Sequence, residues 1–114
     1  MGQEGIRELN DFLYNLKKNF SPNLILLFGS RARNEYLKES DYDFIIVSEK
    51  FEGVHFLKRI EQVLLFWTIN QDVDILPYTP EEFEKKKQEI GIVKEALSEG
   101  IILEDKFPER AAVY

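Results

Sequence analysis

The chain has 114 residues, of which 44% are hydrophobic and 32% are charged, and its formal net charge is −6. This length fits one domain with a buried core, and the absence of cysteine excludes disulfides and thiolate metal sites. The acidic balance argues against general binding of DNA or RNA, which needs a basic surface, but not against ATP bound through a divalent metal. The sequence contains no apolar run of the roughly 18 residues that cross a bilayer and no secretory signal pattern, so we expect a cytoplasmic protein.

The first part of the chain predicts a helix followed by a buried strand. Apolar residues recur at helical spacing over residues 3–20, and the Ser-Pro-Asn sequence at 21–23 ends that helix. Residues 24–28 form a continuous apolar run, short enough for a strand that is buried on both faces. A Gly-Ser turn follows, and residues 31–37 suit a short helix.

The middle of the chain predicts two more strands with a helix between them. Residues 44–47 are a second buried strand, and Asp72–Leu76 alternates as a third, which Pro77 is expected to end. The helix opens at Gly53. Its expected core face is made of Phe56, Leu57, Ile60, Val63, Leu64 and Trp67.

Two features of this helix do not belong to that core face. His55 lies near its start and is expected to cap the helix or to be solvated, and not to bind metal. Leu65, Phe66 and Ile69 lie off the apolar face, where they would contact another chain or be covered by the last helix or the tail.

The last part of the chain predicts a capped helix and a short strand. Thr79 is the expected cap, with Pro80 in the first position and Glu82 reaching back to complete a capping box. The helix is expected to continue to Gly100, a left-handed stop, and residues 101–103 to add a strand. The helix is expected to run through Phe83, Ile90, Val93, Ala96 and Leu97.

This order of elements predicts an α/β (α+β) fold, in which helices pack against a mixed β-sheet. We expect one domain over residues 1–104 and a C-terminal tail over residues 105–114. The strand order cannot be read from the sequence.

Gly29-Ser30 is the first candidate for chemistry. It ends a buried strand just before a predicted helix, where free backbone N–H groups favour anions. Gly29 lets a phosphate approach the backbone, the Ser30 hydroxyl adds a donor, and Arg31 and Arg33 supply positive charge. Taken alone, the same pattern is also that of an ordinary turn.

Asp41 and Asp43 form the second candidate. Alternate residues of a strand share a face, so their carboxylates project together from α-carbons about 6.5 Å apart. Two such charges are unfavourable unless a cation lies between them, and oxygen ligands of this kind suit Mg²⁺. The alternative is that both residues merely solvate the entrance of a buried strand.

A third carboxylate lies near the start of the 72–76 strand. If this strand neighbours the 44–47 strand, Asp74 completes a triad around two metal ions, which suits an in-line displacement at phosphorus. Asp74 would also be placed to accept the proton of the attacking hydroxyl. Asp72 is the alternative, but the apolar neighbours of Asp74 place Asp74 inside the strand.

The combined pattern resembles that of the minimal nucleotidyltransferases of the DNA polymerase beta superfamily. Gly29-Ser30 is followed after ten residues by Asp41-x-Asp43, and then by Asp74 on a later strand. The first helix and the closing 98–103 segment resemble the same family, so the likeness covers nearly all of residues 5–104. One departure is Asn34, where members often have glycine, although asparagine also tolerates left-handed geometry.

The resemblance implies roles for these residues. Family members transfer a nucleoside monophosphate from an NTP to a hydroxyl, release pyrophosphate and use two Mg²⁺ ions. By resemblance, Gly29 and Ser30 hold the β- and γ-phosphates, while Asp41 and Asp43 carry the metals. Asp74 ligates the catalytic metal.

The resemblance also implies a biological role. It favours transfer of AMP from ATP, and the small members resemble the antitoxin half of two-gene systems whose partner is a helical HEPN-type ribonuclease toxin. A hydroxyl of that partner is then the implied acceptor. Two alternatives stay open: a non-catalytic antitoxin that neutralises its partner by occlusion, and the catalytic subunit of a two-chain small-molecule nucleotidyltransferase.

Overall fold

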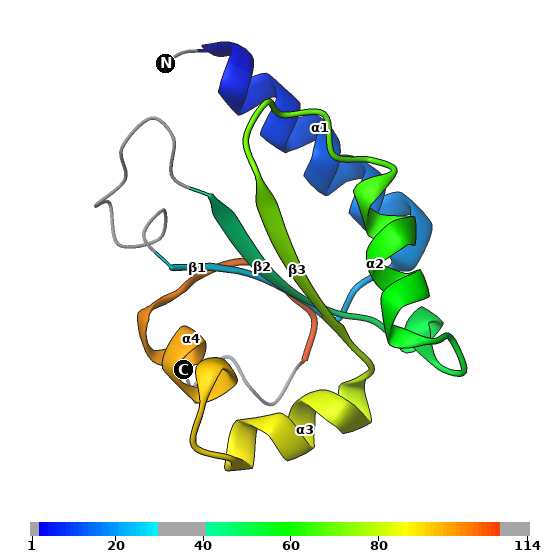
Figure 1. The fold of residues 1–114 in the computed structure, drawn as a ribbon, viewed down its shortest axis with the longest axis vertical. Coiled ribbons are helices and arrows are strands. Elements are labelled where there is room, and N and C mark those ends of the chain that lie inside the picture. Colours follow the sequence, from blue (N-terminus) through cyan, green and yellow to red (C-terminus); the bar gives the residue numbers. More distant parts are fainter. Residues whose placement is uncertain (1–2, 30–40, 108–114) are drawn as a thin grey trace.

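The computed structural model describes residues 3–29 and 41–107, with side chains described from Arg7 onward (Figure 1). Within these residues the elements follow in the predicted order, but a short 3-10 helix is added after the second strand and the predicted last helix is two helices. The helix predicted over residues 31–37 lies outside the described residues. The elements are α1 (Gln3–Phe20), β1 (Leu24–Phe28), β2 (Tyr42–Val47), the 3-10 helix η1 (Glu49–Phe51), α2 (Phe56–Leu64), β3 (Val73–Tyr78), α3 (Pro80–Gln88), α4 (Ile92–Glu99) and β4 (Ile101–Asp105).

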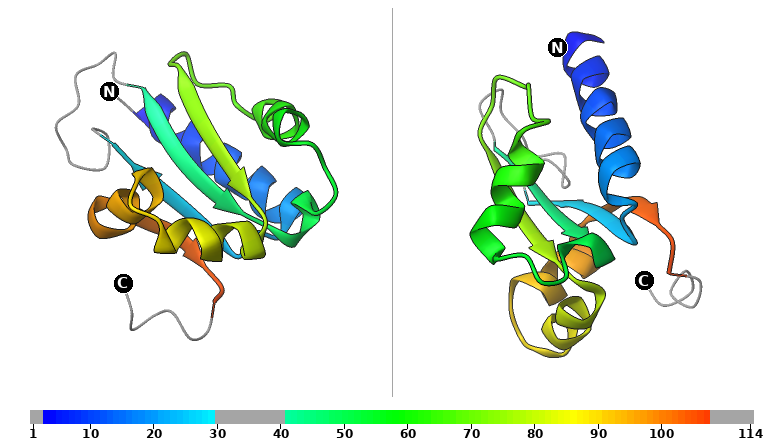
Figure 2. Two further views of the ribbon diagram at one scale, coloured as in Figure 1. Left: turned by 60° about the horizontal axis from the view of Figure 1, so that its bottom comes forward. Right: turned by 90° about the vertical axis from the view of Figure 1, so that its right-hand side faces the viewer.

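The four strands form one mixed sheet in the order β3-β2-β1-β4. Strand β1 pairs antiparallel with both β2 and β4, whereas β2 and β3 are parallel. Helices α1 and α2 cover one face of this sheet, and α3 and α4 cover the other (Figure 2). The predicted α/β fold class is therefore confirmed.

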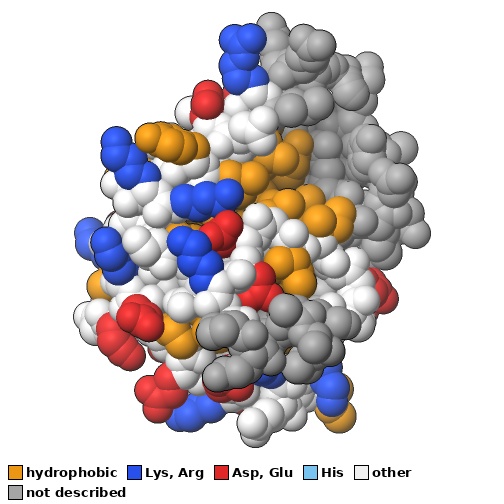
Figure 3. Space-filling view, turned by 180° about the vertical axis from the view of Figure 1, so that it is seen from behind, with side chains coloured by type: hydrophobic (Ala, Val, Ile, Leu, Met, Phe, Trp, Pro, Cys, Tyr) orange, Lys and Arg blue, Asp and Glu red, His pale blue; other side chains and the backbone are white. Residues whose placement is uncertain are grey.

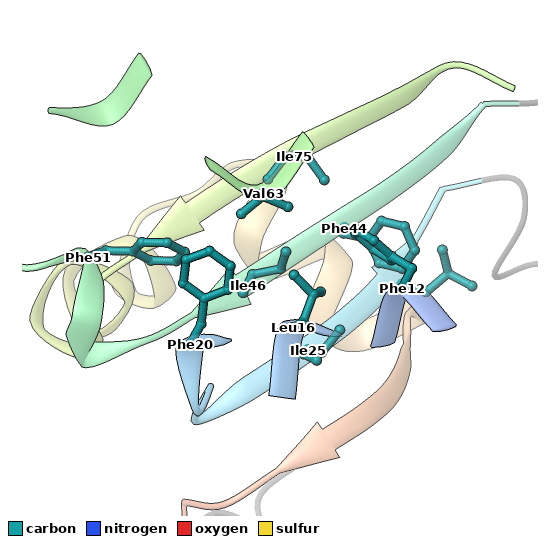
Figure 4. Close-up of a cluster of buried hydrophobic side chains, with 10 residues drawn as sticks. Phe12, Leu16, Phe20, Ile25, Phe44, Ile46, Phe51, Val63 and Ile75 are labelled. Atoms are coloured by element: carbon teal, nitrogen blue, oxygen red, sulfur yellow. The ribbon is translucent and has the colours of Figure 1, made fainter. Parts of the chain in front are cut away.

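Strand β1 and residues 44–47 of β2 are unbroken apolar runs, because successive side chains alternate between two cores. Ile25 and Leu27 of β1 face α1 and α2, whereas Leu24 and Leu26 face α3 and α4. The first core is seen in Figure 4, where side chains from α1, β1, β2, β3, η1 and α2 converge. Its buried members are Phe12, Leu16, Phe20, Ile25, Leu27, Phe44, Ile46, Phe51, Val63 and Ile75.

The predicted core face of α2 is partly wrong. Phe56, Leu57 and Leu64 were expected in the core but are 36%, 62% and 39% exposed, whereas Arg59 and Val63 are buried. Arg59 can be buried because its guanidinium donates hydrogen bonds to two backbone carbonyls and to the Glu82 carboxylate. The inward face of α2 is therefore turned away from Leu57 towards Arg59.

The residues that were expected to lie off the core face of α2 differ in their burial. Leu65 is 79% exposed, as expected, whereas Phe66 packs edge-on against Phe20 in the first core and was wrongly placed off the core face. His55 caps α2, as predicted, because its Nδ1 accepts a hydrogen bond from the Leu57 backbone N–H.

The predicted last helix breaks between α3 and α4. Thr79, Pro80 and Glu82 form the predicted capping box at the start of α3. Helix α3 then ends at Gln88, before the extended Glu89, and Ile90, which was expected within the helix, lies outside both helices and is 95% exposed. Gly91 is a poor helix former, and the break lets α4 turn back to pack on β1.

Two predicted element ends are also corrected. Pro77 lies inside β3, opposite Ile46, and does not end the strand; β3 is an edge strand, where proline is tolerated. Gly100 is extended, not left-handed. Glycine is needed there because a Cβ would lie 2.5 Å from the Ala96 carbonyl oxygen and 2.9 Å from that of Leu27.

The last strand is longer than the predicted strand over residues 101–103. β4 runs through Asp105, and Phe107 stacks on Phe83 of α3. On the face seen in Figure 3, the described lysine and arginine side chains are interspersed with acidic ones. None of the described helices has the length and hydropathy that a membrane span requires.

Candidate active site

The site lies at one end of the sheet, where the ends of β1, β2 and β3 lie side by side. The C-terminal end of β1 meets the N-terminal end of β2 because these strands are antiparallel, and β3 starts beside β2 because that pair is parallel. In this register Phe28 is opposite Asp43, and Asp43 is opposite Asp74. Two carboxylates that are 31 positions apart in the sequence therefore become direct neighbours on the sheet.

The two aspartates share a face of the sheet. Asp43 alternates with Ile45 and Val47, and Asp74 alternates with Leu76, all of which belong to the core beneath α3 and α4. Asp43 is half-buried and Asp74 is exposed at the edge. The pair thus lies at the rim of that face, open to a ligand.

Gly29 brings the backbone against this pair. It has a φ of +81°, a left-handed conformation that disfavours other residues, and a Cβ at this position would overlap Oδ2 of Asp43. In this structure the group next to the Gly29 backbone is the Asp43 carboxylate, and the approach of a phosphate to Gly29 stays a prediction. Glycine is required there for both its conformation and its lack of a side chain.

The electrostatics of the site centre on Asp43. Burial, a side-chain hydrogen bond with Asp74, and the charges of Asp74 and Asp41 raise its pKa from 3.8 to about 6. Each cause opposes a negative charge on Asp43, so the site without a cation holds more negative charge than it can stabilise.

Asp41 and Asp72 lie just outside the paired carboxylates. Asp41 precedes β2, is exposed, and acts on Asp43 only through its charge. Asp72 precedes β3, and its backbone carbonyl accepts the N–H of Tyr42. The register thus brings Asp74, and not Asp72, opposite Asp43.

The donor set fits a hard divalent cation. Among the described residues, the side chains that gather here are carboxylates, and Mg²⁺ takes one or two carboxylates together with waters and substrate phosphates. Within residues 3–29 and 41–107, no three His, Cys, Asp or Glu side chains stand close enough to enclose a metal by themselves. The Asp43–Asp74 pair, with Asp41 nearby, is therefore an open site that a phosphate-bearing ligand would complete.

Three of the predicted nucleotide-binding residues cannot be placed. Ser30, Arg31 and Arg33 lie outside the described residues, as does Asn34. Of the predicted phosphate-binding segment, the structure describes Gly29 alone. The roles of the other residues stay predictions.

Sequence reasoning missed a small pocket next to the site. It has a volume of about 180 Å³ and lies between the end of β1 and α4. It was not foreseen because only the break before α4 brings that helix to β1. The lining residues are Phe28, Gly29, Ile92, Glu95, Ala96 and Glu99.

A family model described as a nucleotidyltransferase domain matches residues 7–112. The chain belongs to the nucleotidyltransferase domain family. The predicted resemblance is thereby confirmed at the level of the family. Among curated proteins, none matches this nucleotidyltransferase domain.

Solved structures share the fold of this nucleotidyltransferase domain. A candidate nucleotidyltransferase from Sulfolobus solfataricus is 21% identical, with a TM-score of 0.55 over 90% of this chain and 87% of that chain. A toxin–antitoxin structure with AMP-PNP is 16% identical, with a TM-score of 0.59 over 88% of this chain and 75% of that chain. BolA1 from Arabidopsis thaliana is 21% identical, with a TM-score of 0.52 over 66% of this chain and 94% of that chain.

At these identities the likeness concerns the fold alone. The nucleotidyltransferase and the toxin–antitoxin structure match most of this domain, whereas the BolA protein matches two thirds of it. The general enzyme class therefore rests on the family match, and the chemistry of the site rests on the residues described above.

Proposed function

We propose that this domain transfers AMP from ATP, with Mg²⁺, to a hydroxyl of a partner protein. The observation that carries the proposal is the Asp43–Asp74 pair, held in register on parallel strands with the backbone of Gly29 against it. Burial and the neighbouring carboxylates disfavour a negative charge on Asp43, and a metal–nucleotide complex would offset that charge.

In this proposal the aspartates divide the work. Asp41, Asp43 and Asp74 would hold the metal, as predicted from the sequence, and two bound Mg²⁺ ions would supply charge neutralisation at the entering and leaving oxygens. Asp74, the more exposed of the paired carboxylates, accepts the proton of the acceptor hydroxyl.

In the proposed reaction one bond forms at the α-phosphorus and one bond breaks. The acceptor oxygen forms a bond to the α-phosphorus as its proton passes to Asp74. The bond from the α-phosphorus to the bridging oxygen breaks, and pyrophosphate leaves with that electron pair. The products are an AMP ester of the acceptor and pyrophosphate.

A protein acceptor and ATP as donor are supported by the toxin–antitoxin structure with AMP-PNP that shares this fold. An antitoxin role with a HEPN-type helical partner follows from the family resemblance. The exposed apolar side chains of Leu57 and Leu65 on and after α2 suit contact with another protein.

That same surface favours a second candidate function. A non-catalytic antitoxin would neutralise its partner by covering it, and would need the apolar surface but not the carboxylates. Replacing Asp43 would then leave neutralisation intact, whereas replacing Leu57 and Leu65 by Ser would abolish it.

The test is transfer of label from ATP into proteins of a host-cell extract with Mg²⁺. We expect a band with label at the α-phosphate and none with label at the γ-phosphate, because pyrophosphate leaves. Asp43→Asn and Asp74→Asn should abolish the band. Asp72→Asn is the matched control, since it removes a neighbouring carboxylate that does not face Asp43, and should keep it.

Two outcomes would contradict the catalytic proposal. Label transferred from the γ-phosphate would indicate a kinase. Full neutralisation of a toxic partner by Asp43→Asn, without any band, would favour occlusion.

A further inference from the structure

We infer that Trp67 is a positioning residue that holds the carboxylate-bearing ends of β2 and β3 at a fixed separation. This inference rests on the proposed function, since it concerns the same site. Trp67 lies just after α2 and packs, half-buried, against the first core. It does not reach the carboxylates, because it stands on the opposite face of the sheet from Asp43 and Asp74.

Trp67 is joined to β2 through Tyr42. Tyr42 lies between Asp41 and Asp43 in the sequence, so its side chain projects to the face opposite theirs. Its ring meets Trp67 edge-on at 5.2 Å between centroids and stacks on Phe44 at 6.1 Å. Any movement of Tyr42 would therefore move the backbone of its sequence neighbours Asp41 and Asp43.

Trp67 is also joined to the start of β3. Its indole Nε1 donates a hydrogen bond of 2.9 Å to the Gln71 carbonyl, two residues before β3 begins. In the same stretch the Tyr42 N–H donates to the Asp72 carbonyl at 3.0 Å. One side chain therefore contacts β2 through its ring and the approach to β3 through its N–H.

The core anchors this bridge. Trp67 meets Phe12 of α1 edge-on at 4.9 Å and Phe44 at 5.9 Å. Phe12 in turn lies against Phe44 (Figure 4). The bridge matters for the site because Asp43 and Asp74 stand directly opposite each other in the register of β2 and β3. Any change in the separation of these two strand ends therefore changes the separation of the two carboxylates.

The test measures Mn²⁺ binding, and not activity. MnCl₂ is titrated into the full chain without nucleotide, and free Mn²⁺ is followed by its electron paramagnetic resonance signal. Asp43→Asn defines binding outside the site. We expect Trp67→Leu to weaken Mn²⁺ binding roughly 10-fold, the lower end of the effect of losing a group that orients metal ligands.

Phe66→Leu is the matched control. Phe66 is the neighbouring aromatic residue of the same core, but it contacts Phe20, at the other end of the sheet from the site. It should lower the melting temperature as Trp67→Leu does and leave Mn²⁺ affinity unchanged. Trp67→Phe keeps a ring and loses the N–H, and should give an intermediate affinity. It also tests the inference should Trp67→Leu fail to fold.

Each remaining outcome is decisive. Wild-type affinity in the Trp67 variants, or an equal loss in Phe66→Leu, would overturn the positioning role and leave the proposed function standing. Failure of the wild-type chain to bind Mn²⁺ above the Asp43→Asn baseline would overturn the proposed metal site, and the inference with it.

Discussion

At this end of the sheet, the negative charge of Asp43 suits the proposed metal binding but destabilises the folded protein when no metal is bound. Its pKa of about 6 lies above the ordinary 3.8, because burial and the neighbouring carboxylates disfavour its charge. A carboxyl with a raised pKa contributes stability that is complete at low pH and lost as the pH rises through the folded-state value. Without metal, the protein is therefore expected to lose this contribution between about pH 4 and pH 6.

The Asp43→Asn variant tests this expectation in EDTA. At pH 7.5 it should melt a few degrees above the wild type, a modest shift because solvent screens a half-exposed carboxyl. The difference should shrink towards pH 4, where the wild-type carboxyl is protonated. Melting curves at several pH values measure it. A difference that is constant from pH 4 to pH 7.5 would show that ionisation of Asp43 is not its cause.

Gly29 offers a second prediction at this scale. Gly29→Ala places a Cβ at φ +81° and against Asp43, so we expect a loss of about 1–2 kcal/mol of unfolding free energy and weaker Mn²⁺ binding. Gly53→Ala is the control, because Gly53 has a φ of +74° but open space around its Cβ position. Urea unfolding should show similar losses in both variants. Weakened Mn²⁺ binding in Gly53→Ala as well would contradict a specific effect of the overlap with Asp43.

Between elements, the buried Arg59 links both faces of the sheet at its β3 edge. From α2 it donates to the Pro77 carbonyl in β3 and, through two nitrogens, to both carboxylate oxygens of Glu82 in α3. The same Glu82 closes the capping box with Thr79. One ion pair thus fixes the position of α2, β3 and the start of α3.

This ion pair has a testable pH dependence. The hydrogen bond from Arg59 lowers the pKa of Glu82, so its contribution to stability is present above the ordinary value of 4.5 and lost as the pH falls below it. Glu82→Gln should therefore destabilise the protein at pH 7 and differ less from the wild type near pH 3. Glu81→Gln, at the exposed neighbouring position, should change little at either pH. Urea titrations at both pH values measure this, and equal losses at the two would contradict it.

The molecule as a whole is acidic, with a net charge of −6, and its proposed ligand is also an anion. We therefore expect ATP to bind only together with the metal. We expect Mg²⁺ with ATP to raise the melting temperature, since ligand at 100 times its dissociation constant adds about 2.7 kcal/mol. Thermal denaturation with Mg²⁺ alone, and with ATP in EDTA, supplies the controls. An equal rise in Asp43→Asn would show that the nucleotide binds elsewhere.

The local features of this protein could be predicted from its amino-acid sequence alone. The helical spacing over residues 3–20, the apolar run at 24–28 and the capping box at Thr79 each act within a few residues, and each is found as predicted. Asp41, Asp43 and Asp74 could be proposed as site residues, because alternation within a strand and acidic residues at the start of a strand are also local patterns.

Features that depend on distant partners emerge only in the folded chain. The parallel pairing of β2 with β3 places Asp74 opposite Asp43, and no local pattern fixes that register. Arg59 could not be predicted as a core residue, because its burial is favourable only once Glu82 and the carbonyls of Val54 and Pro77 surround it. The sequence determines what each segment tends to form, whereas neighbours from elsewhere in the chain determine which faces are buried and which charges meet.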